Sequence, residues 1–349
     1  MAIKPRAAVL KMAPYHPPTG NRIEKMRLDF NENTVGCSPR VLDSLRNGLS
    51  REGLAVYPDY ARVKRSLARY FDVTPDEFLV TNGTDEAIQL LIHTYVSAGD
   101  EVLILRPSYA MYKFYAELAD AKLVAVDYQQ PELNFPLGGL SAAITTRARA
   151  ILIGNPNNPT GTAIDLVAIR SILESAPDAA VLIDEAYYEF FGVTALPLIQ
   201  QFPNLFVSRT FSKAFGMAGM RIGCLFSQQP NVEYLHKGQS PYSVNGPATL
   251  AAGAAVEDEA YVRSYVAEAL TSRELLTSGL EKLGIQYVAS SANFVLCYFG
   301  DRAIEVCDVL RENAILIRDR SYEIPGGVRI TVGTPQQAQQ VLDELERIW

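Results

Sequence analysis

The sequence predicts an α/β fold with two domains: a large domain whose mostly parallel sheet is covered by helices, and a smaller α+β domain. Between about residues 79 and 227, short runs rich in Val, Ile and Leu alternate with helix-like stretches. These runs are continuously apolar, which is typical of strands buried on both faces of a parallel sheet. After Gly284 the pattern changes to shorter elements. The chain has 349 residues, whereas an ordinary domain has roughly 150, so two domains are expected.

The large domain begins, in this interpretation, after an extended arm. Residues 1–35 contain several prolines and are predicted to form this arm, which also completes the small domain. Residues 36–270 are predicted to form the large domain, with strands at residues 101–107, 122–128, 148–155, 179–188, 205–212 and 222–227. A helix is expected from Thr84, because Asp85 and Glu86 in its first turn complement the helix dipole. Residues 246–283 are expected to form one or two further helices.

The small domain is predicted to span residues 271–349. Its strands are expected at residues 285–290, 293–299, 314–320 and 328–333, with a helix at 303–313. The last helix should begin at Thr334, because Pro335 follows it and Gln337 stands three residues on, which is a capping box.

Composition excludes several classes of function. The net charge of −7 and the pI of about 5.2 argue against a nucleic-acid partner, because phosphate binding requires clustered Lys and Arg. Four cysteines and three histidines show no metal-ligand spacing, so no metal is expected. No apolar run approaches the roughly 18 residues of a membrane span, and the N-terminus lacks a signal sequence. A cytoplasmic protein without a membrane partner is therefore predicted.

Residues 207–223 suggest a pyridoxal phosphate site. Lys213 supplies an amine able to form a Schiff base with the aldehyde of this cofactor. Thr210 and Ser212 lie two residues apart, so they project to the same side of an extended chain. Together with Arg221 they can surround a phosphate with hydroxyl and guanidinium donors.

Further polar residues follow predicted strands. Asp184 ends a buried strand, at the edge where parallel α/β sheets bind ligands, and its carboxylate could pair with the pyridine nitrogen. Tyr187 and the amide of Asn158 can reach the 3′-oxygen of the ring. Gly83 and Thr84 can offer backbone N–H groups to the phosphate at a helix N-terminus. Tyr109 could stack on the pyridine.

The chain resembles the histidinol-phosphate aminotransferase subfamily of the fold-type I pyridoxal phosphate aminotransferases. The resemblance covers nearly the whole chain through ordered motifs, namely PYHPP, RLDFNEN, YPD, TNGTDEAI, PSYAMY, NPNNPTG, DEAYYEF, SKAFGMAGMRIG, LIRD and VRITVG. It implies that Lys213 carries the Schiff base and acts as base and acid, and that Asp184 and Tyr187 complete the catalytic set. The other cofactor residues it implies are Asn158 at the 3′-oxygen, Tyr109 on the ring, and Gly83, Thr84, Thr210, Ser212 and Arg221 at the phosphate.

The same resemblance implies a homodimer and a set of substrate contacts. Tyr57 matches a tyrosine that reaches the cofactor phosphate of the neighbouring subunit. Arg329 matches the residue that holds the α-carboxylate in a bidentate pair, and Arg318 lies where a phosphate or distal carboxylate is expected. Tyr15 matches an arm residue that closes over the substrate, and Asn31 is a candidate for the same rim.

The leading hypothesis is transamination of L-histidinol phosphate with 2-oxoglutarate in histidine biosynthesis. An aromatic amino-acid aminotransferase on the same scaffold is the alternative, because imidazole and phenyl rings have similar bulk. A phosphoamino-acid decarboxylase and a non-catalytic module that binds pyridoxal phosphate are two further alternatives. A nucleotide-dependent oxidoreductase is disfavoured, because no GxGxxG follows a predicted strand.

Overall fold

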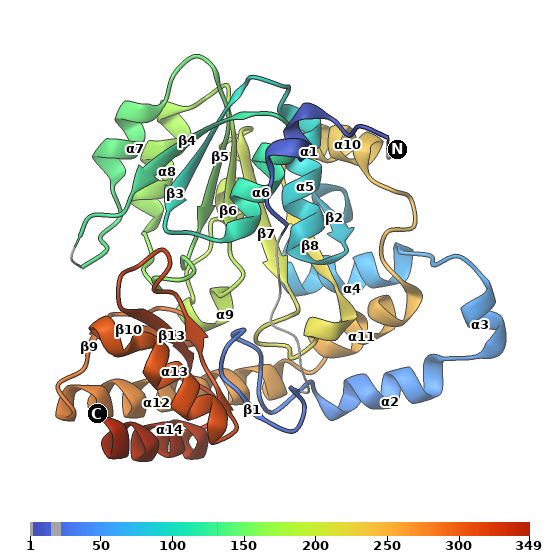
Figure 1. The fold of residues 1–349 in the computed structure, drawn as a ribbon. Helices are drawn as coiled ribbons and strands as arrows, with labels where there is room; N and C mark the ends of the chain where they lie inside the picture. Colours follow the sequence, from blue (N-terminus) through green and yellow to red (C-terminus); the bar gives the residue numbers. More distant parts are fainter. Residues whose placement is uncertain (1–2, 15–21, 131) are drawn as a thin grey trace.

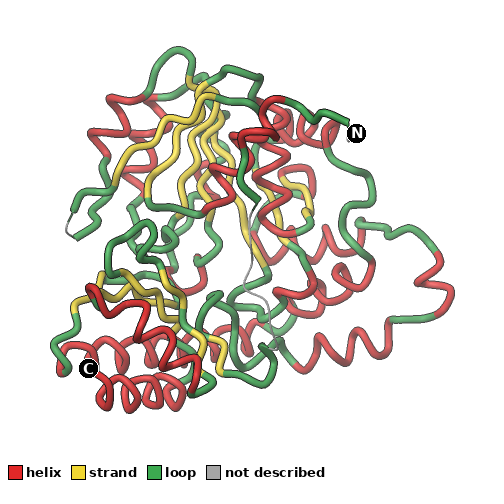
Figure 2. Tube along the Cα trace, viewed as in Figure 1, coloured by secondary structure: helices red, strands yellow, loops and turns green. Residues whose placement is uncertain are grey.

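The computed structural model describes residues 3–14, 22–130 and 132–349. A large domain is built on a twisted central sheet, and a small domain containing the C-terminus packs at one end of that sheet (Figure 1). Figure 2 shows the strands of the central sheet between layers of helices. The predicted α/β class is confirmed.

The central sheet has seven strands in the order β2-β8-β7-β6-β5-β3-β4. Their bounds are β2 Phe78–Thr81, β3 Glu101–Arg106, β4 Lys122–Asp127, β5 Ala148–Gly154, β6 Ala180–Asp184, β7 Leu205–Thr210 and β8 Gly223–Phe226. Strands β3 to β7 run parallel, and β8 is antiparallel to both of its neighbours. The carboxyl ends of β5, β6 and β7 therefore share one edge, which faces the small domain (Figure 1).

Alternating side chains of each central strand enter two separate layers of core. On β3, Val102 and Ile104 pack with α5 (Gly83–Tyr95), α6 (Ala110–Leu118) and α10 (Gln229–Gly238). Leu103 and Leu105 point the other way, because successive side chains of a strand project to opposite faces. That second face is covered by helices including α4 (Ala61–Phe71), α8 (Leu166–Ser175) and α11 (Gly246–Val256). Burial on both faces explains why the strand sequences are continuously apolar.

Strand β4 differs from the prediction. It is the outer strand next to β3, and none of its residues is fully buried. The expectation that residues 122–128 form a strand buried on both faces is therefore wrong. As an outer strand it is only partly covered: Val124 and Val126 pack on the side of α7 (Leu137–Ala143), and Leu123 packs on the side of α6.

The small domain is built on a four-stranded antiparallel sheet in the order β12-β13-β10-β9. Its elements are β9 Gln286–Val288, β10 Phe294–Tyr298, α13 Ala303–Glu312, β12 Arg318–Asp319, β13 Gly327–Thr331 and α14 Pro335–Ile348. The capping box at Thr334 is confirmed, because its hydroxyl accepts from Gln337 N and the Gln337 side chain accepts from Thr334 N. The predicted strand at 314–320 is split into β11 (Ile315–Leu316) and β12.

Strand β11 pairs with β1 (Met26–Arg27), so the N-terminal segment joins the C-terminal domain. Upstream, a short helix α1 (Ala7–Lys11) replaces part of the extended arm that the sequence predicted. The predicted domain boundary at residue 270 falls inside helix α12 (Glu259–Lys282), which contacts α9 (Tyr188–Phe191) and α14. The division into domains at that residue stays a prediction.

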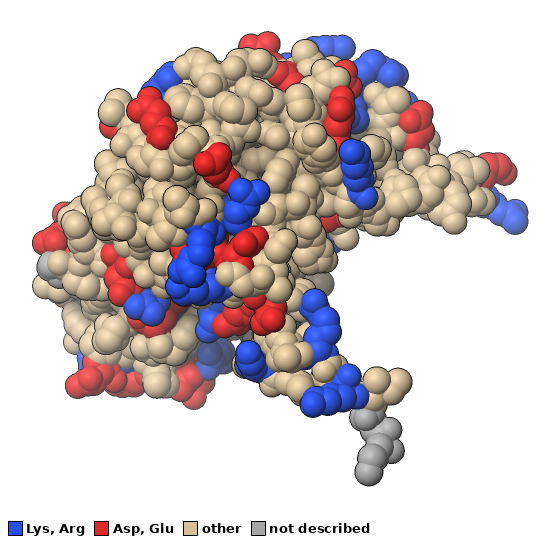
Figure 3. Space-filling view, turned by 90° about the horizontal axis from the view of Figure 1, so that it is seen from above, with Lys and Arg blue, Asp and Glu red and all other residues tan. Residues whose placement is uncertain are grey.

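Helices α2 (Pro39–Gly48) and α3 (Arg51–Ala55) form an extension of the large domain, which projects to the lower right in Figure 1. Basic and acidic side chains are interspersed over the face seen in Figure 3. Within the described residues, no helix combines the length and the apolar character needed to cross a bilayer.

Candidate active site

A cavity of about 590 Å³ lies where the carboxyl ends of the parallel strands meet the small domain. It brings together most of the residues that the sequence singled out, although they come from segments as distant as residues 31 and 329. The predicted residues on its wall are Asn31, Thr84, Tyr109, Asn158, Asp184, Tyr187, Thr210, Ser212, Lys213, Arg221, Arg318 and Arg329. Gly83 lies just behind this wall, and Tyr57 lies outside it.

Lys213 follows β7 and extends into the cavity. Its Nζ donates to the carbonyl oxygen of Phe30 over 2.9 Å. Burial and then the nearby Arg329 guanidinium lower the pKa of Lys213 to about 8, against the opposing effect of Glu32. The amine therefore loses its proton more readily than an ordinary lysine does, and the unprotonated form is the one that can act as nucleophile or base.

Asp184 ends strand β6 and is almost completely buried. Burial raises the pKa of its carboxyl to about 6, although hydrogen bonds from two hydroxyl groups oppose this shift. Ser208 Oγ donates to Oδ1 over 2.8 Å, and Tyr112 OH donates to Oδ2 over 2.9 Å. A carboxylate in this setting gains from a cationic ligand group, because its charge is poorly solvated.

Behind Asp184, polar groups link the two domains. Tyr187 OH accepts from Asn31 Nδ2 over 2.9 Å, and both side chains are buried. Asn31, which lines the cavity, is thus bound to a predicted cofactor residue. Arg329 donates to Asn158 Oδ1 and, over 2.6 Å, to the carbonyl oxygen of Asp29. Asn158, which is predicted to bind the cofactor's 3′-oxygen, and Arg329, which is predicted to bind the substrate's carboxylate, thus contact each other.

The opposite end of the cavity is shaped for an anion. Gly83 begins helix α5 with a φ of +75°, and a Cβ at this position would stand 2.6 Å from Arg221 Nη2. Arg221 approaches Asp85 Oδ2 over 3.2 Å and Ser212 Oγ over 3.5 Å. The N–H groups of the first helical turn and the Arg221 guanidinium therefore lie at one place, a combination that binds phosphate.

Tyr109 and Tyr57 differ in their placement. Tyr109 lines the cavity at the start of α6, and its hydroxyl donates to Asp85 Oδ1 over 2.8 Å. Tyr57 lies on the extension after α3, is 76% exposed and stacks on Tyr242 with ring centroids 4.2 Å apart. It contributes nothing to the cavity of its own chain. Tyr15 lies outside the described residues.

Sequence reasoning missed several residues of the site. Tyr112 and Ser208 bind Asp184, Asp85 binds Tyr109 and Arg221, and Arg320 lines the cavity. Two of these carried a local signal. Tyr112 lies one helical turn after Tyr109, and Ser208 lies two residues before Thr210 on the same strand, so each shares a face with a predicted residue.

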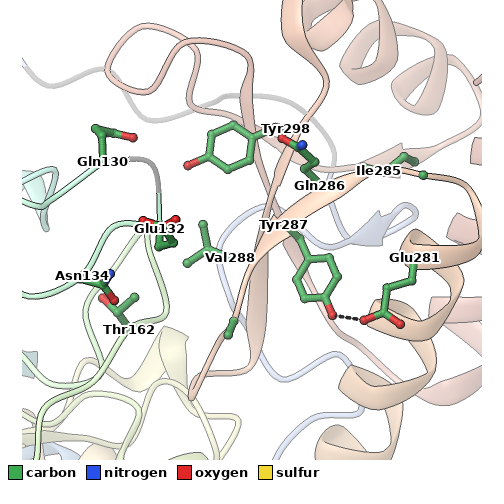
Figure 4. Close-up of a pocket in the computed structure, with 12 residues that line it drawn as sticks. Gln130, Glu132, Asn134, Thr162, Glu281, Ile285, Gln286, Tyr287, Val288 and Tyr298 are labelled. Carbon is green, nitrogen blue, oxygen red and sulfur yellow. Dashed lines mark hydrogen bonds between the residues drawn. The ribbon is translucent and has the colours of Figure 1, made fainter.

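A second cavity, of about 730 Å³, lies between the loop after β4 and the outer strand of the small domain. Figure 4 shows Glu132 and Asn134 on one side of it and Val288, Tyr287 and Tyr298 across from them. None of the predicted site residues lines it. In addition, no group of three or more His, Cys, Asp or Glu among the described residues could hold a metal ion.

Comparison with known proteins decides the family. A family model described as aminotransferase class I and II matches residues 23–345. The chain belongs to the class I and II aminotransferase family. It is 35% identical to a histidinol-phosphate aminotransferase of Symbiobacterium thermophilum, over 98% of this chain and 97% of the relative. This class I and II aminotransferase is thus an enzyme that transfers amino groups.

Solved structures agree with the fold of this aminotransferase. The histidinol-phosphate aminotransferase of Clostridium acetobutylicum is 26% identical and superimposes with a TM-score of 0.85, covering 93% of this chain and 98% of that one. The histidinol-phosphate aminotransferase of Sinorhizobium meliloti, solved with pyridoxal-5'-phosphate, is 23% identical and has a TM-score of 0.89, covering 99% and 98% of the two chains. At that identity the second likeness concerns the fold alone.

Pyridoxal phosphate is the cofactor of this family, and the residues of the cavity fit it. The cradle at Gly83 suits the phosphate because a Cβ would fill it. Asp184 is a buried acid whose partners among the described residues are two hydroxyl groups, so it can accept a protonated pyridine nitrogen. Lys213 supplies the amine in the same cavity. Size also agrees, because ligand cavities commonly span about 300–1,000 Å³.

Proposed function

We propose that this aminotransferase transfers the amino group of L-histidinol phosphate to 2-oxoglutarate, with pyridoxal phosphate as cofactor. The observation that carries the proposal is a single cavity that holds Lys213 and Asp184 together with guanidinium groups of the small domain, of which Arg318 and Arg329 have no ion-pair partner among the described residues. The names of the full-length relatives support the same substrate.

Bound pyridoxal phosphate supplies an aldehyde carbon that accepts an amino group and a ring that withdraws electrons. Lys213 Nζ would hold the cofactor at that carbon, and Arg221, Ser212 and the start of α5 would hold its phosphate. With a substrate amine in the cavity, Lys213 Nζ would be placed to take a proton from the substrate α-carbon. Its lowered pKa of about 8 suits this role, because a base works best when its pKa is near the operating pH.

Asp184 and Tyr187 orient and tune the cofactor. The Asp184 carboxylate would hold the proton on the pyridine nitrogen, which gives the ring its electron-withdrawing character. Ser208 and Tyr112 fix both carboxylate oxygens, so the carboxylate cannot turn away. Tyr187 OH already accepts one hydrogen bond from Asn31, which leaves its own proton to donate to the cofactor's 3′-oxygen.

Two arginines would select the substrates. Arg318 on β12 and Arg329 on β13 are direct cross-strand neighbours, so their side chains share one face of the small sheet. Arg329 would hold the α-carboxylate of glutamate or 2-oxoglutarate, and Arg318 the distal carboxylate or the phosphate of histidinol phosphate. Tyr15 would close over either substrate.

The proposal includes a homodimer in which Tyr57 completes the partner's site. Its support is the exposure of Tyr57 together with Leu54 and Val56 on the projecting extension, since clustered exposed apolar groups are typical of interfaces. A hybrid of Lys213→Ala and Tyr57→Phe subunits tests this directly. If Tyr57 crosses to the partner, each hybrid dimer contains one intact site, whereas sites confined to one chain would leave none. The cytoplasmic location stays a prediction.

Half-reactions with single amino donors test the substrate. The panel comprises histidinol phosphate, phenylalanine, tyrosine, aspartate and glutamate, with the Lys213→Ala variant as the blank. We expect the highest kcat/KM with histidinol phosphate. A preference for phenylalanine by tenfold or more would contradict the proposal and favour the aromatic aminotransferase.

A further inference from the structure

Arg320 is a buried arginine on the wall of the catalytic cavity. Only 8% of its surface is exposed. Its one charged partner among the described residues is Glu323, and its Nε is buried without any hydrogen-bond partner there. A buried guanidinium with an unused donor is costly, so its position on a ligand cavity needs an explanation.

Three guanidinium groups lie on the same side of the small sheet. Arg318 and Arg329 are cross-strand neighbours. Arg320 lies two residues beyond Arg318, and its backbone N–H continues the ladder to Gly327 O over 2.9 Å. Residues two apart on a strand project to the same face. All three side chains therefore reach the cavity together.

The positive charge of this group is only partly compensated. Burial and the neighbouring Arg320 and Arg318 lower the pKa of Arg329 to about 10. Among the described residues, Glu323 is the carboxylate paired with Arg320, while Arg329 Nε is also buried without a partner. Among the described residues, one carboxylate is thus ion-paired with this group of three guanidinium groups, which can accommodate a ligand with two negative charges.

The backbone holds Arg320 firmly in place. The N–H groups of Glu323 and Ile324 both donate to Arg320 O, over 3.0 and 2.9 Å. Gly327 cannot carry a side chain, because a Cβ there would stand 2.9 Å from Ile324 O. The guanidinium is thus carried by a closed backbone turn, so binding a ligand there requires only side chains to move.

We propose that Arg320, together with Arg318, binds the phosphate dianion of the substrate, and that Glu323 is an exchangeable counter-ion that releases Arg320 when the phosphate binds. The inference rests on the proposed function and names a specificity residue for it. A phosphate offers several acceptor oxygens, which can satisfy the unused Arg320 Nε and the Arg318 guanidinium together. A single carboxylate has fewer acceptors and half the charge.

Two substitutions with opposite expected effects test this exchange. Methyl phosphate is titrated into the pyridoxal phosphate-loaded enzyme at pH 7.5 and its dissociation constant is measured by calorimetry. Arg320→Gln should weaken binding by about 10- to 100-fold, because a charged hydrogen-bond donor is lost. Glu323→Gln should tighten binding by about 3- to 10-fold, because the competing anion is removed.

The control is Arg311→Gln, which removes another arginine paired three residues away, with Asp308, on the same domain but outside the cavity. It should leave the dissociation constant unchanged. If Arg320→Gln does not fold, Arg320→Lys replaces it and should weaken binding less than tenfold while Glu323→Gln still tightens it. Weaker binding in both the Arg320 and the Glu323 variants would show that the pair only supports the turn and would overturn the proposal.

Turnover separates this inference from the proposed function. The ratio of kcat/KM for histidinol phosphate to that for histidinol should fall at least tenfold in Arg320→Gln. An unchanged ratio in an enzyme that does transaminate histidinol phosphate would overturn the role of Arg320 and leave the proposed function intact. In another outcome, Arg320→Gln weakens methyl phosphate binding and Glu323→Gln tightens it, but the parent enzyme does not turn over histidinol phosphate. That result would support the role of Arg320 and contradict the proposed function.

Discussion

Tyr112 and Asp184 form a hydrogen bond of 2.9 Å in which the buried tyrosine hydroxyl donates to the carboxylate. The bond connects α6 to the end of β6, which are 72 residues apart in the chain. It stabilises the charged form of an aspartate whose pKa burial raises to about 6. The proton affinity of Asp184 is therefore set by residues of three separate elements.

Tyr112→Phe should raise the pKa of Asp184 further, because a hydrogen bond to the ionised carboxylate is lost. Pyridoxal phosphate needs the charged carboxylate, so its affinity for the apoenzyme should fall as the pH decreases through the pKa of Asp184. This fall should move to higher pH in the variant by about one pH unit. Cofactor dissociation constants measured between pH 5 and 8 check this, with Tyr115→Phe on the same helix as the control. Coincident curves for Tyr112→Phe and the parent enzyme would argue against the contact.

Gly83→Ala should weaken cofactor binding at the phosphate end. The new Cβ would stand 2.6 Å from Arg221 Nη2, so the guanidinium would have to leave the cradle. Gly99→Ala is a matched control, since Gly99 also has a positive φ but has open space around it. Both variants carry the backbone strain of roughly 1 kcal/mol, and Gly83→Ala alone should lose cofactor affinity. Equal dissociation constants for the two variants would contradict the steric explanation.

Arg209→Met should destabilise the large domain strongly. Arg209 pairs with Glu185 over 2.7 Å, and both side chains are almost wholly buried. Removing one partner of such a pair costs about 3–5 kcal/mol, because the other charge stays buried. Arg263→Met removes an exposed pair with Glu259 and should cost about 0–1 kcal/mol. Denaturant unfolding of both variants measures the difference, and similar costs would be inconsistent with this reasoning.

The apoenzyme should lose stability as the pH rises from 5.5 to 7.5. Burial raises the pKa of Asp184 from 3.8 to about 6 and that of Glu189 from 4.5 to about 7. The folded state therefore binds more protons than the unfolded state in this window, and the free energy of unfolding falls with increasing pH by roughly 1–3 kcal/mol. Glu101, whose pKa is lowered to about 2, is ionised in both states throughout.

Unfolding midpoints in urea at the two pH values measure this slope. The Glu189→Gln variant should show a smaller loss, because one of the two titrating carboxyls is gone. A midpoint that rises with pH in the parent apoenzyme would contradict the assignment of these buried acids.

Local sequence patterns were sufficient for the class of the fold and for the residues that stand at strand ends. Lys213 and Asp184 follow apolar runs whose direction and burial the composition indicates, so their shared edge could be predicted. The edge position of β4 could not, because it depends on the order of strands across the sheet. Its six residues are apolar enough to resemble a central strand.

The missed residues depend on contacts between distant segments. Nothing near Tyr112 indicates that its hydroxyl meets Asp184 rather than solvent. Arg320 stands two residues after Arg318, but its role depends on burial and on the turn to Gly327. The spacing of Tyr112 and Arg320 from predicted residues indicated which face of an element each side chain could share. The residue that each side chain contacts on that face could be found only from the tertiary structure.

The central claim is that Lys213 Nζ is the amine that holds pyridoxal phosphate. Reduction of the cofactor-loaded enzyme with borohydride, followed by peptide mapping, tests it most directly. We predict one stable adduct on the peptide that contains Lys213 and none in Lys213→Ala. An adduct on another lysine, or no adduct in fully loaded enzyme, would contradict the account.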